Sequence, residues 1–175
     1  METESETYAA MLSLDDKNYI LYVDGKLKIH GSSLKGKHMP IVCDEFRDAL
    51  CYAVFRNEDP LQVFRQFQDL TRFKVHDFQI RVYSTKMDYH RNSLYDKLLQ
   101  KLAAQGIRVA AGSSLEYVKT VNGYTPIVLL SSDAAIDYDY YKRRLAEVAS
   151  RILFKPAKFL TKLLGTGQKG LEEFD

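Results

Sequence analysis

The chain has 175 residues, of which 46% are hydrophobic and 27% charged, a composition typical of one soluble globular domain with or without a short arm. No apolar run approaches the ~18 residues of a membrane-spanning helix, and the acidic N-terminus lacks the basic segment of a secretory signal. Two cysteines, Cys43 and Cys51, make neither a disulfide framework nor a zinc cluster. We therefore expect a reducing, cytoplasmic compartment and no membrane partner.

Charge is segregated along the chain although the net charge is only +2. Residues 1–16 carry five acids and no base, whereas residues 17–37 carry five lysines and one aspartate. Residues 151–169 carry five bases and no acid, and the last six residues carry three acids. Two basic segments of this kind suit a partner with a polyanionic backbone, and a solvated surface is the alternative interpretation.

The first structured segment is predicted to be a β-hairpin over residues 17–30, because aromatic and β-branched residues flank the turn dipeptide Asp24-Gly25. A loop rich in glycine, serine and lysine follows over residues 31–39. Apolar residues at helical spacing predict a helix over residues 41–55, and Pro60 begins a second helix.

The rest of the chain combines short strands with two longer helices. In chain order the pattern predicts a strand over 73–83, a helix over 88–105 ended by Gly106, short strands over 107–110, 115–121 and 127–130 with a turn at Asn122-Gly123, a helix over 136–154, and one or two turns over 157–164. The fold class is α+β, a β-hairpin arm plus a mainly helical domain with a few short antiparallel strands. We divide the chain into an acidic arm, a hairpin with a basic loop, a helical domain and a flexible tail, at residues 1–16, 17–40, 41–164 and 165–175.

No residue pattern predicts catalysis by this chain. Residues 31–38 approach the phosphate-binding loop G-x-x-x-x-G-K-S/T, but His38 stands where a magnesium-binding hydroxyl is needed. The four histidines lack metal-ligand spacing. Asp133, Asp137 and Asp139 imitate a metal cluster, but aspartates before a helix more often cap it. We therefore predict no cofactor and no metal site in this chain.

The last eight residues contain a more specific motif. Gln168, Leu171 and Phe174 have the spacing Q-x-x-L-x-x-F, which resembles the peptide that binds the ring-shaped sliding clamp of archaeal and eukaryotic replication. In such a peptide a short turn seats the two apolar side chains in a pocket while the glutamine reaches a backbone site. Asp175 replaces the usual second aromatic residue, and an amphipathic tail without a partner is the alternative.

Taken in order, the segments resemble the palm edge and thumb at the C-terminal end of family B DNA polymerases. The segment KNYILYVDGKLKIHG is similar to the K-K-x-Y strand and turn of that family through Lys17 and Tyr19. Lys35 and Lys37 lie where the basic pair of the family follows, without matching it as arginines. Gly106, Gly112 and Tyr117 match the fixed points of the thumb pattern. The thumb helix of the family, I-D-x-x-Y-Y ending in R-I-L, is matched by Asp137, Tyr140, Tyr141, Arg151, Ile152 and Leu153. The resemblance extends from about Lys17 to the terminal clamp peptide.

The resemblance implies that this chain grips primer–template duplex DNA without catalysing synthesis. The D-T-D motif, whose aspartates hold the catalytic metals of the family, does not precede Lys17, so Mg²⁺ would belong to a catalytic partner chain. The residues expected to contact DNA form one bank of Lys17, Tyr19, Lys26, Lys28, Lys35 and Lys37, and a second bank of Lys86 and Arg91. Tyr138, Tyr140 and Tyr141 could stack on bases, but a tyrosine cluster at a helix start is more often core.

Three interpretations remain open from the sequence. The first is a non-catalytic thumb-like subunit of a split polymerase, which serves replication or repair at the nucleoid and is tethered to the sliding clamp. The second is an accessory adaptor that contacts the catalytic chain and the clamp but not DNA. The third is a fragment of a longer polymerase, which sequence cannot separate from a natural split, although Met1 favours a complete gene product.

Overall fold

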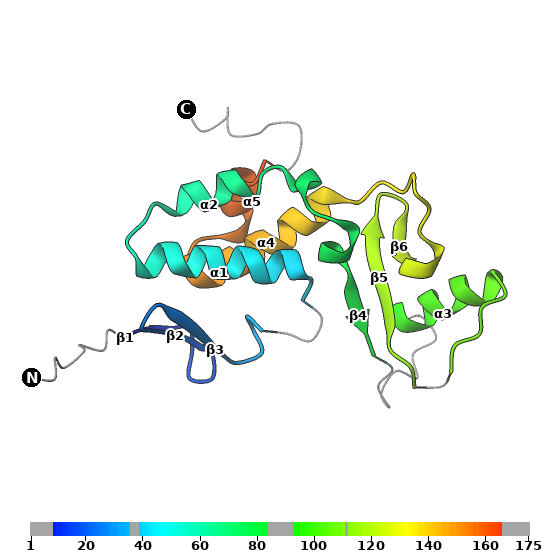
Figure 1. The fold of residues 1–175 in the computed structure, drawn as a ribbon, viewed down its shortest axis with the longest axis horizontal. Helices are drawn as coiled ribbons and strands as arrows, with labels where there is room; N and C mark the ends of the chain where they lie inside the picture. Colours follow the sequence, from blue (N-terminus) through cyan, green and yellow to red (C-terminus); the bar gives the residue numbers. More distant parts are fainter. Residues whose placement is uncertain (1–8, 36–38, 84–92, 111, 166–175) are drawn as a thin grey trace, which may run out of the picture.

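The computed structural model describes residues 9–35, 39–83, 93–110 and 112–165, and is α+β as the sequence predicts (Figure 1). In the described residues, a three-stranded antiparallel sheet lies below a layer of four helices at one end of an elongated molecule (Figure 1). A second three-stranded antiparallel sheet and helix α3 form the other end. No helix of the described part is long and apolar enough to span a membrane.

The N-terminal sheet has the strand order β1 (Ala9–Ser13), β2 (Tyr19–Val23) and β3 (Lys26–His30). The hairpin of β2 and β3 is confirmed: Asp24 and Gly25 have φ of 50° and 81°, the positive values that a type I′ turn requires. Strand β1 was not predicted. It comes from the acidic segment and pairs antiparallel with β2.

The helical layer consists of α1 (Ile41–Phe55), α2 (Pro60–Gln66), α4 (Tyr138–Leu153) and α5 (Ala157–Leu163). The predicted bounds of α1 and the start of α2 are confirmed. The buried side chains of α1, which include Phe46 and Leu50, share one apolar core with Leu145 and Ile152 of α4. This core fixes α1 and α4 against each other, and the N-terminal sheet is attached to it through Ile20 of β2.

The second sheet pairs β4 (Ile80–Val82), β5 (Leu115–Thr120) and β6 (Gly123–Pro126), beside α3 (Leu94–Ala104). Ser93 caps α3 by accepting a hydrogen bond from the Asp96 amide, and Gly106 follows the helix with φ of 75° as predicted. The prediction of one helix from residue 88 was wrong at its beginning, because Ser93 is extended and the helix starts at Leu94; residue 88 itself lies outside the described residues.

Three strand predictions were wrong in whole or in part. Within residues 73–83 only Ile80–Val82 is a strand; Val75–Phe78 is a 3₁₀ turn, because the Asp77 carboxylate accepts a hydrogen bond from the Lys74 amide at 3.0 Å. Residues 107–110 have no strand. The strand predicted over 127–130 is instead a 3₁₀ turn at Ile127–Leu129. The strand that pairs with β5 lies earlier, because it begins directly at the turn residue Gly123 and ends at Pro126.

The tyrosine cluster at the start of α4 belongs to the core. Asp137 caps α4 through its carboxylate, which accepts a hydrogen bond from the Tyr140 amide at 3.1 Å, as the capping interpretation predicts. Tyr141 is fully buried; its hydroxyl donates to the Phe78 carbonyl at 2.7 Å and accepts from the Lys119 amide at 3.0 Å. Burial raises the pKa of Tyr141, so the phenol stays neutral. Tyr141 therefore holds α4 against the second sheet.

Phe154, directly after α4, combines a strained backbone with an exposed ring. Its φ of 55° and ψ of 40° are left-handed, and the residue is 65% exposed. A β-carbon in this conformation costs about 1 kcal/mol relative to glycine. We expect Phe154→Gly to exceed Phe154→Ala in free energy of unfolding by about that amount, measured by urea denaturation. Both variants remove the ring, so equal stabilities would show that the backbone is unstrained.

Candidate nucleic-acid interface

Three of the predicted DNA contacts lie on one face of the N-terminal sheet. Lys26, Lys28 and His30 are exposed, whereas Leu27 and Ile29 between them are partly buried against the core. Side chains directly opposite each other in an antiparallel pair share a face. Tyr19 pairs with His30, and its ring stacks on the imidazole at 4.6 Å, so it lies on the same face as both lysines.

Lys17 lies at the end of this sheet, in the connection between β1 and β2. Its backbone amide donates to the Asp15 carboxylate at 2.8 Å, and the Asn18 amide donates to the same oxygen at 2.9 Å. These hydrogen bonds, the one from Lys17 first, lower the pKa of Asp15. The carboxylate thus shapes the turn, and the Lys17 side chain is exposed beside it.

The loop that follows β3 is held from three sides. The Asn18 side-chain oxygen accepts a hydrogen bond from the Ser33 amide at 3.1 Å, and Arg151 of α4 donates to the Ser33 carbonyl at 2.8 Å. Arg47 of α1 donates to the carbonyl of the buried Leu34 at 2.9 Å. Lys35 is therefore exposed at the end of a fixed segment.

Arg47 is a charged anchor on the buried side of α1. It is only 7% exposed and forms ion pairs with Asp44 at 2.7 Å and Asp48 at 2.8 Å. Burial raises the pKa of Asp44, although the guanidinium opposes that shift. A buried arginine requires such partners, since an unpaired charge in the core is strongly destabilising. This role cannot be seen in the sequence, because Asp44 and Asp48 on both sides of Arg47 are typical of a solvated helix face.

Gly31 permits the close approach of this loop to the β1–β2 turn. Its φ is +100°, and a β-carbon there would lie 2.1 Å from the Asn18 side-chain oxygen and 2.6 Å from the Lys17 carbonyl oxygen. No side chain fits this position without moving the turn. The backbone therefore brings Lys17 and the basic loop together at one end of the sheet.

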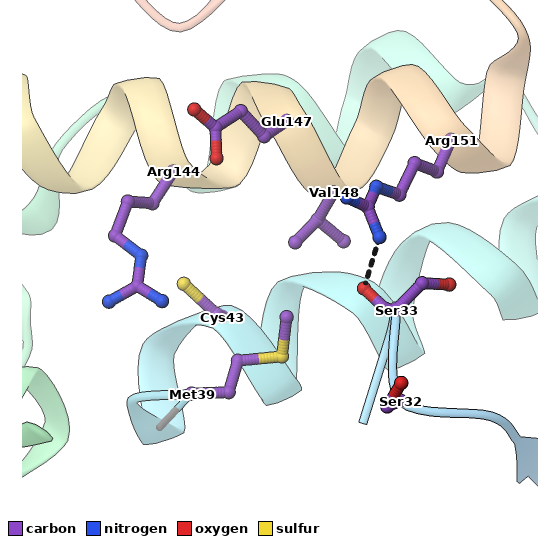
Figure 2. A pocket seen from close by; sticks show the side chains of 8 residues that line it. All are labelled: Ser32, Ser33, Met39, Cys43, Arg144, Glu147, Val148 and Arg151. Carbon is purple, nitrogen blue, oxygen red and sulfur yellow. Dashed lines mark hydrogen bonds between the residues drawn. The ribbon is translucent and has the colours of Figure 1, made fainter. Parts of the chain in front are cut away.

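A cavity of about 440 Å³ lies behind the same loop, between α1 and α4 (Figure 2). Residues Arg144, Glu147, Val148 and Arg151 project from one face of α4. Opposite them, Ser32, Ser33 and Met39 of the loop and Cys43 of α1 complete the lining (Figure 2). Burial raises the pKa of the Cys43 thiol to about 12, so it is neutral and a poor nucleophile at physiological pH.

The remaining predicted residues are outside the part of the chain that the structure describes. These are Lys37 of the first bank, Lys86 and Arg91 of the second bank, and Gln168, Leu171 and Phe174 of the tail. Their contacts stay predictions. Within the described ranges, the structure has no group of three or more histidine, cysteine, aspartate or glutamate side chains that could hold a metal ion.

Comparison with known proteins finds a likeness in fold alone. No protein-family model matches the chain, and no curated protein matches it in sequence. Among solved structures, the family B DNA polymerase from the hyperthermophilic archaeon Pyrobaculum calidifontis is similar, with a TM-score of 0.66 and 16% sequence identity. The similarity covers 81% of this chain and 21% of that polymerase. The chain therefore has a fold similar to part of a family B polymerase, and it spans about a fifth of the length of the polymerase it matches.

We expect Gly31→Ala to dislodge the basic loop. A matched control is Gly106→Ala, where φ is +75° but no atom lies within 4 Å of the added β-carbon. Both variants incur the conformational cost, and Gly31→Ala adds steric overlap worth ~1–3 kcal/mol of unfolding free energy. Urea denaturation measures the difference, and hydrogen exchange of the Ser33 amide, which bonds to Asn18, should accelerate only in Gly31→Ala. Equal losses in both variants would contradict the tight approach.

Proposed function

We propose that this chain is a non-catalytic, thumb-like subunit that grips primer–template duplex DNA for a catalytic family B polymerase chain, in replication or repair. The observation that carries the proposal is the exposed sheet face that presents Lys26 and Lys28. Lys35, exposed on the fixed segment after β3, adds a further positive charge. The likeness in fold to part of a family B polymerase supports it independently of the charge pattern.

The grip would be electrostatic and largely independent of DNA sequence. Lysines that neutralise phosphates release condensed counterions, so affinity depends steeply on salt concentration. Backbone contacts set the register of a protein on the duplex and carry no base information. Tyr19, half-buried and stacked on His30, would lie against a sugar or a groove edge. A fixed loop loses little conformational entropy on binding, which favours affinity.

Catalysis would come from the partner chain. In the proposed division of labour that chain contributes the metal-binding aspartates and the Mg²⁺, and the present chain contributes the hold on the product duplex. The first edge of the N-terminal sheet offers a surface for such a partner: β1 contains no charged residue, and Met11 at its centre is 63% exposed. An uncharged edge strand is open to pairing with a strand of another chain.

That same edge favours a second candidate function, an adaptor that contacts the polymerase and the clamp but not DNA. Strand β3, at the opposite edge, carries Lys26 and Lys28, charges that discourage strand pairing. The two functions differ in what the lysines do. If the paired variant Lys35→Glu with Lys37→Glu leaves duplex binding unchanged, the adaptor is supported.

Charge reversal on the sheet face should weaken duplex binding. For the paired variant Lys26→Glu with Lys28→Glu we expect affinity for a primer–template duplex to fall at least ~10-fold, because two phosphate contacts become repulsive. The slope of log affinity against log salt should decrease in magnitude by about 2. Fluorescence anisotropy over a salt series measures both. The matched control, Arg65→Glu with Lys74→Glu, makes the same charge change at two exposed residues outside both basic segments. An equal loss in this control would contradict a localised grip.

The tail is proposed to tether the subunit to a sliding clamp through Gln168, Leu171 and Phe174. A phenylalanine that fills an apolar pocket often contributes 2 kcal/mol or more, so Phe174→Ala should reduce clamp affinity at least ~10-fold. Surface plasmon resonance with immobilised clamp measures this change. Glu172→Ala, which removes a tail side chain outside the motif, is the control. Comparable binding by wild type and Phe174→Ala would reject the tether without bearing on the DNA grip.

A further inference from the structure

We propose that the cavity between the basic loop, α1 and α4 is a binding site for a phosphate group. The site consists of the Arg151 and Arg144 side chains on one wall and of Ser32 and Ser33 of the loop on the other (Figure 2). The inference rests on the proposed function in one respect, the assignment of that phosphate to a nucleic-acid backbone. The site itself stands on the geometry of the cavity.

Arg151 is the principal donor. One of its terminal nitrogens donates to the Ser33 carbonyl at 2.8 Å, which fixes the guanidinium at the cavity (Figure 2). A guanidinium has five N–H donors in a planar fork, so donors remain for a ligand oxygen. The side chain is exposed and accessible to a ligand from solvent. A phosphate held by such a fork receives charge-assisted hydrogen bonds, the strongest class in proteins.

Arg144 approaches the cavity from the other end. It lies seven residues before Arg151, two helical turns along the same face of α4, and points toward Cys43 (Figure 2). Arg144 also interacts with the Tyr140 side chain, which positions it without removing its charge. Two guanidinium groups thus flank the cavity, and the neutral Cys43 thiol adds no repulsion toward an anion.

The opposite wall supplies neutral donors. Ser32 and Ser33 belong to the loop that Asn18, Arg47 and Arg151 hold in place, so their positions are set before any ligand arrives. Hydroxyls donate to phosphate oxygens and also accept, which suits either ionisation state of a phosphate. The cavity volume of about 440 Å³ lies within the range of small-ligand sites and leaves room for a sugar beside the phosphate.

Glu147 makes it possible to distinguish an anion site from a cation site by substitution. It lies between the two arginines on the same face of α4 and is exposed. Its carboxylate repels an anion, so its removal should strengthen phosphate binding while removal of an arginine weakens it. A cation-binding site would respond to the same substitutions in the opposite directions.

The test is a titration of the whole chain with inorganic phosphate at constant ionic strength, against chloride as the reference anion. The readout is the NMR signal of the Met39 methyl group, which lines the cavity. We expect saturable binding that Arg151→Gln weakens at least ~10-fold and Glu147→Gln strengthens about threefold. The matched control is Arg143→Gln, an exposed arginine of the same helix that does not line the cavity, and it should leave binding unchanged.

Because Arg151 also holds the loop, Ser32→Ala provides a second variant that removes a donor without an anchor. It should weaken phosphate binding with an unchanged melting temperature. A Met39 response to phosphate equal to that to chloride, or equal losses in Arg143→Gln and Arg151→Gln, would overturn the site.

The source of the phosphate is decided by adding duplex DNA. If Glu147→Gln strengthens duplex binding and free phosphate competes with the duplex, the ligand is a backbone phosphate. If phosphate binds as expected but neither Glu147→Gln nor Ser32→Ala changes the affinity for duplex DNA, the ligand is a phosphorylated small molecule. The second result supports the site whether or not the chain grips DNA through its lysines. Failure of the site is therefore distinct from failure of the proposed function.

Discussion

The hydrogen bond from Arg47 to the Leu34 carbonyl joins the N-terminal sheet to the helical layer, and both candidate surfaces depend on it. Taking a guanidinium out of water is costly, and the cost is offset only when its donors meet well-placed acceptors. Here Asp44 and Asp48 neutralise the charge and the backbone carbonyl takes a further donor. Burial raises the pKa of Asp44 and the Arg47 guanidinium opposes that shift, so the pair contributes to position more than to stability.

The anchored loop has two sides with different chemistry. Lys35 is exposed and interacts electrostatically with Asp44 of α1, whereas Ser32 and Ser33 line the cavity against α4. A loop without anchors would sample many conformations, and any ligand would have to supply the free energy to order it. The Arg47, Arg151 and Asn18 hydrogen bonds supply that order in advance. The contact of Arg151 with Ser33, 118 residues apart in sequence, therefore helps to determine the local geometry of residues 31–35.

The features that the sequence predicted well are those that local chemistry decides. Asp24-Gly25 accepts positive φ at both positions, so the hairpin follows from two residues, and the apolar spacing from Ile41 onward defines α1 to its last residue. Strand β1 could not be predicted this way, because the short segment Ala9–Ser13 has no β-branched or aromatic residue and forms its strand by pairing with β2. Phe78 likewise looked like part of a strand, but it lies in the core against Tyr141 at the end of a 3₁₀ turn. Of the proposed site, the exposed lysines were visible in the sequence, whereas Asn18, Arg47 and Arg144 were not, since nothing local distinguishes them from solvated polar residues.

The arrangement of charge also constrains how the two surfaces act on each other. Arg151 holds the Ser33 carbonyl at the cavity, and Lys35 is exposed two residues further along the same loop. An anion that accepts hydrogen bonds from the remaining N–H groups of Arg151 fixes the guanidinium that holds the Ser33 carbonyl. The loop is then harder to displace. Thermodynamic linkage then requires the reverse effect: a polyanion that binds the lysine face and stabilises the loop raises the affinity of the cavity for its anion. Local ordering of this kind couples neighbouring sites without any change of fold, because each ligand removes part of the disorder that the other would have to remove.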